Sequence, residues 1–273
     1  MRLGDICSKI GSGATPRGGK EAYSASGIPI IRSQNVLDWS FSSNGLAYLN
    51  DEQARTLSNV EVHQGDILLN ITGDSVARAC IVPSDVIPAR VNQHVAILRP
   101  KEKANATFIL AWLQTNKDLL LKLASSGATR NALTKRMLEG LDINLPSIDI
   151  QNHIAALISL IQSKINLNIK LNGYLLELAT TRFEQALFKS NRVVRLGDIV
   201  KLEDSKRVPL NSRDRDARKG PYPYYGATSI MDYVDDYLFD GIRVLLGEDG
   251  SVIDESGRPI LQYVWGKYWV KIG

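Results

Sequence analysis

The chain has 273 residues, of which 44% are hydrophobic and 23% charged, a balance typical of one or two soluble globular domains. It contains no run of about 18 apolar residues and its first residues lack an apolar signal core, so we expect a cytoplasmic protein without a membrane span. The net charge of +4 permits nucleic-acid binding but does not indicate it.

Cysteine and histidine content excludes two further classes of protein. Cys7 and Cys80, in a chain without an export signal, predict no disulfide framework. His63, His94 and His153 are scattered and do not fall at zinc-ligand spacing with the cysteines. We therefore expect no metal site.

Residues 1–146 are predicted to form a mixed α/β domain. Short apolar runs bounded by Gly, Pro, Asn and Asp predict strands at Ile28–Ile31, Gly65–Thr72 and Val91–Leu98. Apolar residues at helical spacing predict a helix over residues 105–124, and a short second helix is expected over Asn131–Leu138. The segment Ile143–Pro146 then closes the domain, because proline stops regular structure.

Residues 147–190 are predicted to form a long helical spacer, with its helix over about 150–189 and Asp149 as its N-cap. The apolar residues recur at steps of three and four, which is a coiled-coil pattern. The predicted pairing positions are Ile154, Ile158, Ile161, Ile165, Ile169, Asn172, Leu176 and Phe183. A rod of roughly 60 Å needs a partner for its apolar seam.

The chain also repeats itself. Arg-Leu-Gly-Asp-Ile occurs at residues 2–6 and again at 195–199. Looser matches follow in the same order: Ile28–Ile31 with Tyr222–Tyr225, and Gly65–Leu69 with 241–246. We therefore expect residues 191–273 to be a second copy of the first domain. No counterpart of the strand near 92–98 or of the later helix follows, so this copy is expected to be incomplete.

No nucleotide-binding or catalytic motif is visible. The segment Gly11–Glu21 resembles a phosphate loop, but an extra glycine intervenes and Glu21 stands where the hydroxyl residue belongs. Pro16 occupies the third glycine position of a dinucleotide fingerprint. The segment is better interpreted as a polar loop that carries Thr15, Arg17 and Lys20.

Polar clusters recur beside the predicted strand and helix ends, at 32–35, 72–78, 90–94 and 125–135. Their side chains are of the kinds that read DNA, because Arg pairs with guanine, Asn and Gln pair with adenine, and Ser, Thr and Lys hold phosphates. With the loop residues Thr15, Arg17 and Lys20, the predicted DNA contacts are Arg32, Ser33, Gln34, Asn35, Thr72, Ser75, Arg78, Arg90, Asn92, Gln93, Thr129, Arg130, Asn131 and Lys135. Each cluster alone is equally typical of a solvated loop.

In combination, these motifs resemble the specificity subunits of type I restriction-modification systems. The resemblance is carried by Leu3–Ile6 with the Gly-Ser-Gly-x-Thr-Pro loop, by Gly27–Ser33, and by Asn92–Leu98. It continues through the long helix with Gln151 to Tyr222–Ala227. It implies an α/β (α+β) target-recognition domain, a long coiled-coil-type helix and a second recognition domain that is incomplete here.

The resemblance also implies a non-catalytic subunit that binds double-stranded DNA and docks methyltransferase subunits, with the restriction and translocase subunit joining through the complex. S-adenosylmethionine and ATP are expected on those partners, and this chain is expected to hold no cofactor. The spacer would act as a ruler, because roughly 60 Å is nearly two turns of DNA at about 34 Å each. Pairing of two such helices would give a homodimer and a palindromic target.

Three alternatives stay open at this point. A stand-alone enzyme would need a cofactor or metal motif, and none is visible in the sequence. A coiled-coil scaffold without DNA readout would explain the spacer but not the repeated domains. A silent or defective specificity cassette would explain the incomplete second copy.

Overall fold

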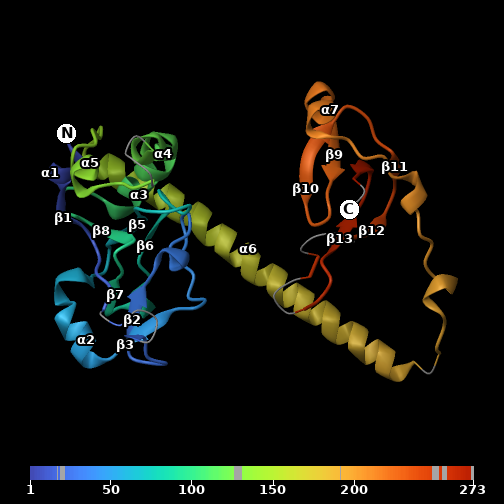
Figure 1. Cartoon of the computed structure of the whole chain (residues 1–273), viewed down its shortest axis with the longest axis horizontal. Helices are drawn as coiled ribbons and strands as arrows, with labels where there is room; N and C mark the ends of the chain where they lie inside the picture. Colours follow the sequence, from blue (N-terminus) through green and yellow to red (C-terminus); the bar gives the residue numbers. More distant parts are fainter. Residues whose placement is uncertain are drawn as a thin grey trace. The chain divides into compact units, whose positions relative to one another are not determined.

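The computed structural model describes residues 1–16, 18, 22–125, 131–190, 192–247, 252–253 and 257–271. The chain divides into two compact units, Met1–Arg182 and Phe183–Gly273, and the division falls inside one long helix (Figure 1). The domain boundaries that the sequence suggests, near residues 146 and 190, stay predictions. No helix in the described ranges is both long and apolar enough to cross a membrane.

The first unit is built on two four-stranded sheets. One has the order β1-β8-β5-β6, is antiparallel throughout, and consists of Cys7–Ser12, Val95–Pro100, Ile67–Asn70 and Ala79–Ile81. The other has the order β3-β2-β7-β4 and consists of Ala47–Leu49, Ile28–Ile31, Ala89–Val91 and Glu61–Val62. In this second sheet β2 and β7 run parallel. The strand predicted over Val91–Leu98 is in fact two, since β7 ends at Val91 and β8 begins at Val95.

Strand β8 contributes to both hydrophobic cores of the first unit. Its side chains alternate between the two faces of the sheet, as the pleat of a strand requires. Val95 and Ile97 join the core that the two sheets share, while Ala96 and Leu98 join the core on the outer face. Both neighbours of β8 pair with it along its length.

Helices pack on the outer face of the first sheet. They are α1 (Leu3–Ile6), α3 (Ala106–Thr115), α4 (Lys117–Ser125) and α5 (Lys135–Glu139). At the second sheet lie α2 (Asp51–Thr56) and the short 3-10 turns η2 (Ser33–Asn35), η3 (Ser58–Val60) and η4 (Ser84–Val86).

The single helix predicted over residues 105–124 is interrupted at Asn116. The backbone of Asn116 leaves helical geometry, and its Nδ2 donates a hydrogen bond to the carbonyl of Trp112 at 2.8 Å. An asparagine side chain that bonds the local backbone competes with helix continuation. The short helix predicted from Asn131 starts only at Lys135, because Thr134 is its N-cap.

The long helix predicted over 150–189 is confirmed as α6, Ile148–Lys189. Asp149 is not its N-cap, because the helix begins one residue earlier and Asp149 lies in the first turn. Gln151 is fully buried and fixes this end of the helix to the first unit. Its Oε1 accepts from the backbone N–H of Asn105 at 2.9 Å, and its Nε2 donates to the carbonyl of Pro146 at 2.8 Å.

The second unit has a four-stranded sheet of order β10-β9-β14-β11 and a separate pair, β12-β13. Its strands are β9 (Lys219–Tyr225), β10 (Ile230–Val234), β11 (Phe239–Asp240), β12 (Arg243–Leu246), β13 (Leu261–Val264) and β14 (Lys267–Val270). The helix α7 (Ser212–Ala217) and the turns η5 (Leu196–Asp198) and η6 (Asp204–Lys206) precede them. Strand β9 is antiparallel to β10 and parallel to β14. In the same way, β2 of the first unit is antiparallel to β3 and parallel to β7. The sheet topology of the second unit therefore repeats that of the first.

The pairing of Asp66 with Arg99 ties β8 to the turn before β5, and its loss is expected to destabilise the first unit. Asp66 has no exposed side-chain surface and receives two hydrogen bonds from Arg99, at 2.7 and 2.8 Å. These bonds raise the pKa of the Arg99 guanidinium. Asp66→Ala should lower the free energy of unfolding by about 2–4 kcal/mol, because the guanidinium of Arg99 loses its carboxylate partner and keeps only its bond to the carbonyl of Glu61. Urea unfolding of this variant measures the loss.

The matched control is Asp85→Ala, which removes an exposed carboxylate from the same unit. It should change the free energy of unfolding by no more than about 0.5 kcal/mol. Equal unfolding midpoints for the two variants would contradict a structural role of the Asp66–Arg99 pair.

Candidate nucleic-acid interface

A polar cleft on the first unit collects side chains from segments that are far apart in the sequence. Its volume is about 1070 Å³. Four segments that leave strands or helices meet there: the turn after β2, the loop between β5 and β6, the turn before β8, and the end of α4 with the residues near 131. The lining residues are Ser33, Gln34, Thr72, Gly73, Asp74, Ser75, Arg78, His94, Ser125, Asn131 and Ala132.

Two buried asparagines hold the turn after β2 at the edge of this cleft. Asn70, at the end of β5, donates from Nδ2 to the carbonyl of Ser33 at 2.8 Å. Asn35 accepts on Oδ1 from the N–H of Arg32 at 3.0 Å, which closes the short turn η2. Because the backbone is fixed on both sides, Gln34 is left exposed beside the cleft.

Hydrogen bonds join the remaining segments into one wall. The Oγ1 of Thr72 lies 2.6 Å from Nδ1 of His94, so the loop after β5 is bonded to the turn before β8. The N–H of Gly73 donates to the carbonyl of Asn131 at 3.3 Å, which brings in the segment after α4. Gly73 has a φ of +75°, a conformation that strains any residue with a Cβ.

The cleft offers the donors and acceptors that base edges and phosphates require. Arg78 is half-buried, and its guanidinium has no hydrogen bond or ion pair with any described part of the protein. A free guanidinium matches the paired acceptors of guanine, and the amides of Gln34 and Asn131 match adenine. Hydroxyl groups such as that of Ser75 bind phosphate oxygens. Asp74 adds one exposed carboxylate, an acceptor that suits the amino group of cytosine and repels phosphate.

Six of the predicted DNA-contact residues line this cleft: Ser33, Gln34, Thr72, Ser75, Arg78 and Asn131. Four others lie elsewhere on the first unit, exposed or half-buried: Thr15, Arg32, Gln93 and Lys135. Arg17, Lys20, Thr129 and Arg130 lie outside the described residues. The sequence therefore identified six residues of this cleft from separate clusters. It did not show that these clusters lie together in space.

Three of the predicted contacts are corrected by the structure, because Asn35, Arg90 and Asn92 are buried and bond to the protein itself. Asn35 also donates to the carbonyls of Ser42 and Asn44. Arg90 donates to the carbonyl of Ala54 at 3.0 Å and pairs with Glu61 at 3.2 Å. Asn92 accepts from the N–H of His94. A side chain with these internal partners is not available to a base or phosphate in this conformation.

Four of the predicted residues on the surface have side-chain partners in the protein. Gln34 donates from Nε2 to the carbonyl of Gly45 at 3.2 Å, and Nε2 of Gln93 lies 3.3 Å from Nε2 of His94. Arg32 donates to the carbonyl of Gly45 and lies over the ring of Tyr23, 5.5 Å from its centroid. Lys135 faces Glu139 one helical turn away, at 3.5 Å. Such an exposed ion pair is weak and leaves the ammonium accessible, whereas Arg32 is held more firmly by two contacts.

His94 and Asp74 line the cleft although the sequence did not single them out as contacts. Both lie within polar clusters that the sequence did identify, at 72–78 and 90–94. Their positions follow from the bond between Thr72 and His94 and from the turn at Gly73. The sequence alone does not show that His94 and Asp74 line the cleft, because it does not show which segments are neighbours in space.

The two cysteines of the first unit are buried thiols. Burial raises the pKa of the Cys7 thiol and of the Cys80 thiol to about 12, so both stay protonated and unreactive at neutral pH. In the described ranges, His, Cys, Asp and Glu do not gather in a group of three or more that would hold a metal ion.

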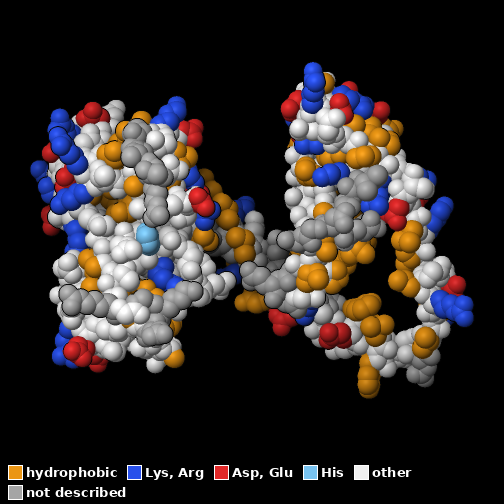
Figure 2. Space-filling model, in the orientation of Figure 1, with side chains coloured by type: hydrophobic (Ala, Val, Ile, Leu, Met, Phe, Trp, Pro, Cys, Tyr) orange, Lys and Arg blue, Asp and Glu red, His pale blue; other side chains and the backbone are white. Residues whose placement is uncertain are grey.

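The predicted helix-pairing residues lie on α6, and most are exposed to solvent. Figure 2 shows apolar side chains gathered along this helix. Ile161, Ile169 and Leu176 are each more than 60% exposed, and Asn172 is exposed in the same register. The exposed members are Ile154, Ile161, Ile165, Ile169, Asn172, Leu176 and Phe183, while Ile158 is half-buried. Gly173 has open space where a Cβ would stand.

Residues 1–175 match the family model of the type I restriction modification DNA specificity domain. Over 74 residues, or 27% of this chain, the sequence is 38% identical to a Haemophilus influenzae protein named as a type I restriction enzyme specificity subunit. The aligned stretch spans only 18% of that relative.

Two solved structures have a similar fold. The S subunit of a type I restriction-modification system from M. genitalium is similar with a TM-score of 0.55 and 15% identity, over 100% of this chain and 70% of that one. The HsdS subunit from Thermoanaerobacter tengcongensis gives a TM-score of 0.44 and 21% identity, over 61% of this chain and 37% of that one. The likeness to the M. genitalium subunit shows a shared fold.

Asn35 and its neighbour Gln34 should differ in their contributions to the stability of the first unit, and this difference can be measured. Asn35→Ala should lower the free energy of unfolding by about 2–3 kcal/mol, because three backbone groups lose their hydrogen-bond partner inside the protein. Gln34→Ala removes an exposed amide and should leave stability within about 0.5 kcal/mol. Chemical denaturation of both variants tests this difference, and a stable Asn35→Ala protein would restore Asn35 as a candidate contact.

Proposed function

The chain belongs to the family of type I restriction-modification DNA specificity domains, and we propose that its first unit reads one half-site of a DNA target through the polar cleft. Membership makes the chain a DNA-recognition component and not itself the catalyst. The observation that carries the proposal is the convergence of six predicted contact residues, from three separate segments, on one cleft of the first unit.

The chemistry of the cleft supports readout of bases in addition to phosphate binding. Arg78 lines the cleft, and the described protein supplies no partner for its guanidinium, so a guanine edge or a phosphate would complete its hydrogen bonding. Gln34 is exposed, and its amide is held beside the cleft by a hydrogen bond from Nε2 to the carbonyl of Gly45 at 3.2 Å. Fixed donors of this kind discriminate bases better than mobile ones, because less conformational freedom is lost on binding.

The partners of such a chain would be methyltransferase subunits that methylate adenine at N6. Methylation requires the base to leave the stack and enter a pocket in the methylating subunit. S-adenosylmethionine would bind there, and ATP would bind on a restriction and translocase subunit that joins the same complex. This chain would hold neither cofactor and would position the partners over the target.

The helix α6 would dock partner subunits and pair with a second copy of the chain. Its exposed apolar residues form a seam that a single chain does not cover within the described residues. Two copies related by a twofold axis would present two identical first units, and the target would then be palindromic. Asn172 in the seam would fix the register of the pair.

The target sequence itself tests the proposed function. Co-expression with the neighbouring methyltransferase subunit, followed by genome-wide mapping of N6-methyladenine, should reveal a split motif. Arg78→Ala and Gln34→Ala should each relax one position, at a cost of about 1–3 kcal/mol for the correct base. Arg55→Ala, an exposed arginine on α2, is the control and should leave the motif unchanged.

The symmetry of the motif separates the alternatives. A palindromic motif supports readout by two first units, and an asymmetric one supports readout by both units of one chain. If both proteins are soluble and no new methylation is found, the chain is a silent cassette or a scaffold. An unchanged motif in every cleft variant would remove the cleft from the proposal.

Helix pairing is tested by the mass of the chain in solution. The double variant Ile161→Asp with Leu176→Asp should convert a dimer to a monomer in light scattering, because it places charge in the apolar seam. Lys170→Asp changes the charge of the same helix outside the seam and should leave the dimer intact. A monomeric unsubstituted chain at high concentration would contradict pairing through α6.

A further inference from the structure

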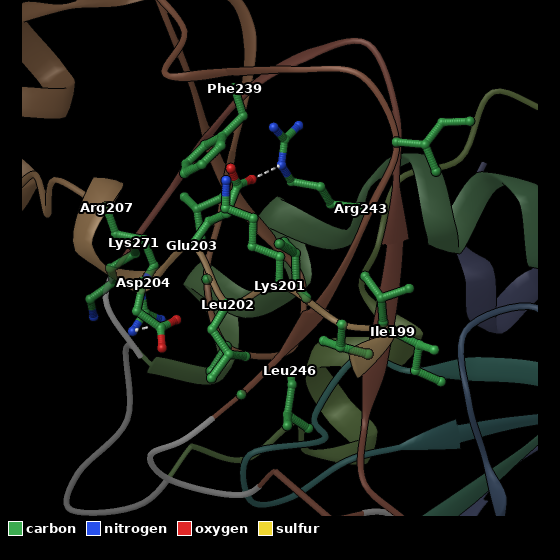
Figure 3. A pocket seen from close by; sticks show the side chains of 18 residues that line it. Ile199, Lys201, Leu202, Glu203, Asp204, Arg207, Phe239, Arg243, Leu246 and Lys271 are labelled. Atoms are coloured by element: carbon green, nitrogen blue, oxygen red, sulfur yellow. Dashed lines mark hydrogen bonds and ion pairs between the residues drawn. The ribbon is translucent and has the colours of Figure 1, made fainter. Parts of the chain in front are cut away.

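Two cavities of the described chain differ in how their carboxylates are paired. In the second unit, a cavity of about 640 Å³ lies between the segment 199–204 and β12 (Figure 3). Both carboxylates in its lining have a cationic partner. Arg243 on β12 donates to Glu203 at 2.6 Å, as a dashed line in Figure 3 shows, and Arg207 lies 3.3 Å from Asp204. The polar cleft of the first unit also holds opposite charges, but they do not pair.

The opposite charges of the cleft belong to Asp74 and Arg78, which lie on the same loop between β5 and β6. Of the described residues that line the cleft, Asp74 is the one with a carboxylate and Arg78 the one with a guanidinium. Neither side chain has a hydrogen bond or an ion pair with a described residue. Since their formal charges cancel, the lining of the cleft has no excess of positive charge to attract phosphate.

Backbone contacts hold the loop that carries both charges. At its base, Ala77 donates from its N–H to the carbonyl of Asn70 at 2.9 Å. Near its tip, the N–H of Val76 donates to Gly73 at 3.1 Å, and the N–H of Gly73 donates to Asn131 on the next segment at 3.3 Å. Ala77 has a φ of +68°, a strained conformation that persists only where surrounding contacts impose it. Asp74, which directly follows Gly73, is therefore presented to the cleft from a fixed backbone.

The carboxylate of Asp74 requires a hydrogen-bond donor from its ligand. An ionised carboxylate only accepts hydrogen bonds. Phosphate oxygens are acceptors and carry negative charge, so this side chain repels the DNA backbone. Readout by Arg78 and Gln34 places the cleft in the major groove, where the donors on the bases are the amino groups of cytosine and adenine. The ligand of Asp74 on DNA is therefore one of these two amino groups.

Cytosine suits a carboxylate better than adenine does. Adenine presents the acceptor N7 beside its amino group, and a carboxylate oxygen facing N7 is repelled. The major-groove edge of cytosine presents the N4 amino group without an acceptor of its own. Amides such as those of Gln34 and Asn131 match adenine instead, because an amide both donates and accepts.

We propose that Asp74 is a specificity-determining residue, whose carboxylate accepts a hydrogen bond from the N4 amino group of one cytosine in the DNA target. This inference rests on the proposed function of the cleft. It leads to two opposite effects when the carboxylate is removed. Discrimination at one base falls, while affinity for DNA of unrelated sequence rises, because a like charge leaves the surface that faces DNA. Loss of a residue that only supports the fold would lower both.

The first experiment selects bound duplexes from a random-sequence library with the full chain and its co-expressed methyltransferase subunit. Asp74→Ala should lose the preference for cytosine at one position and keep the other positions. It should also bind duplexes of random sequence about two- to threefold more tightly. Asp85→Ala, which removes an exposed carboxylate outside the cleft, is the matched control and should change neither property. Equal thermal unfolding midpoints of the two variants check that both are folded.

A base analogue then identifies the group that Asp74 contacts. In the selected duplex, the cytosine at the relaxed position is replaced by pyrimidin-2-one, which lacks the 4-amino group. The loss of affinity should be at least about fivefold larger for the unsubstituted chain than for Asp74→Ala. The four measurements form a double-mutant cycle, so any general weakening of the duplex by the analogue cancels.

An equal loss in both chains overturns the proposal, and so does relaxation by Asp74→Ala at an adenine or at no position. Failure of this proposal differs from failure of the proposed function. If Arg78→Ala and Gln34→Ala relax the motif while Asp74→Ala does not, the cleft reads DNA and the role of Asp74 is wrong. If none of the three variants changes the motif, both the cleft and Asp74 lose the roles given to them.

Discussion

The structure of the first unit depends on the central position of β8. The strand pairs with β1 on one side and β5 on the other, and its alternating side chains enter both cores. Arg99 near its end neutralises Asp66, which has no exposed side-chain surface. The turn that leads into the strand carries His94 to the cleft. Backbone pairing, burial and the position of one cleft wall are therefore set by the same few residues.

Two groups of polar residues form the cleft, one buried and one exposed, and both groups contain amide side chains. Asn35, Asn70 and Asn92 are buried, and their amides bond to backbone groups of the turns they support. Gln34 and Asn131 have similar amides but face the solvent. The buried amides fix the loops, since an unpaired polar group inside the protein would be costly. The exposed amides stay accessible to a ligand, although that of Gln34 also donates to the carbonyl of Gly45.

Much of this arrangement follows from the sequence, and the rest depends on contacts between distant segments. The helix α6 was predictable because its apolar pattern is local and long, and the strand Ile28–Ile31 was predictable because its apolar run is local and well bounded. The break at Asn116 was not, since it depends on one side chain choosing a backbone carbonyl over helix continuation. The burial of Arg90 was not predictable either, because its partners Ala54 and Glu61 lie far along the chain. Convergence of the cleft residues required the sheet order, which no local pattern contains.

The second unit shows how a repeated sequence can lead to different surroundings. Its four-stranded sheet keeps the register of the first unit, down to one hydrogen bond after the parallel pair. The same isoleucine of the repeated motif is buried in one unit and exposed in the other. The repeated motif therefore does not by itself determine burial, which depends on the segments packed around it.

The separation of supporting from exposed amides has an evolutionary consequence. Gln34, Ser75, Arg78 and Asn131 lie in the cleft, and none of them belongs to either hydrophobic core of the first unit. Replacement of such residues costs little stability, because surface substitutions away from buried contacts are close to neutral. A lineage of these chains could therefore drift from one recognised sequence to another through folded intermediates, with Asn35, Asn70 and Asn92 keeping the loops in place.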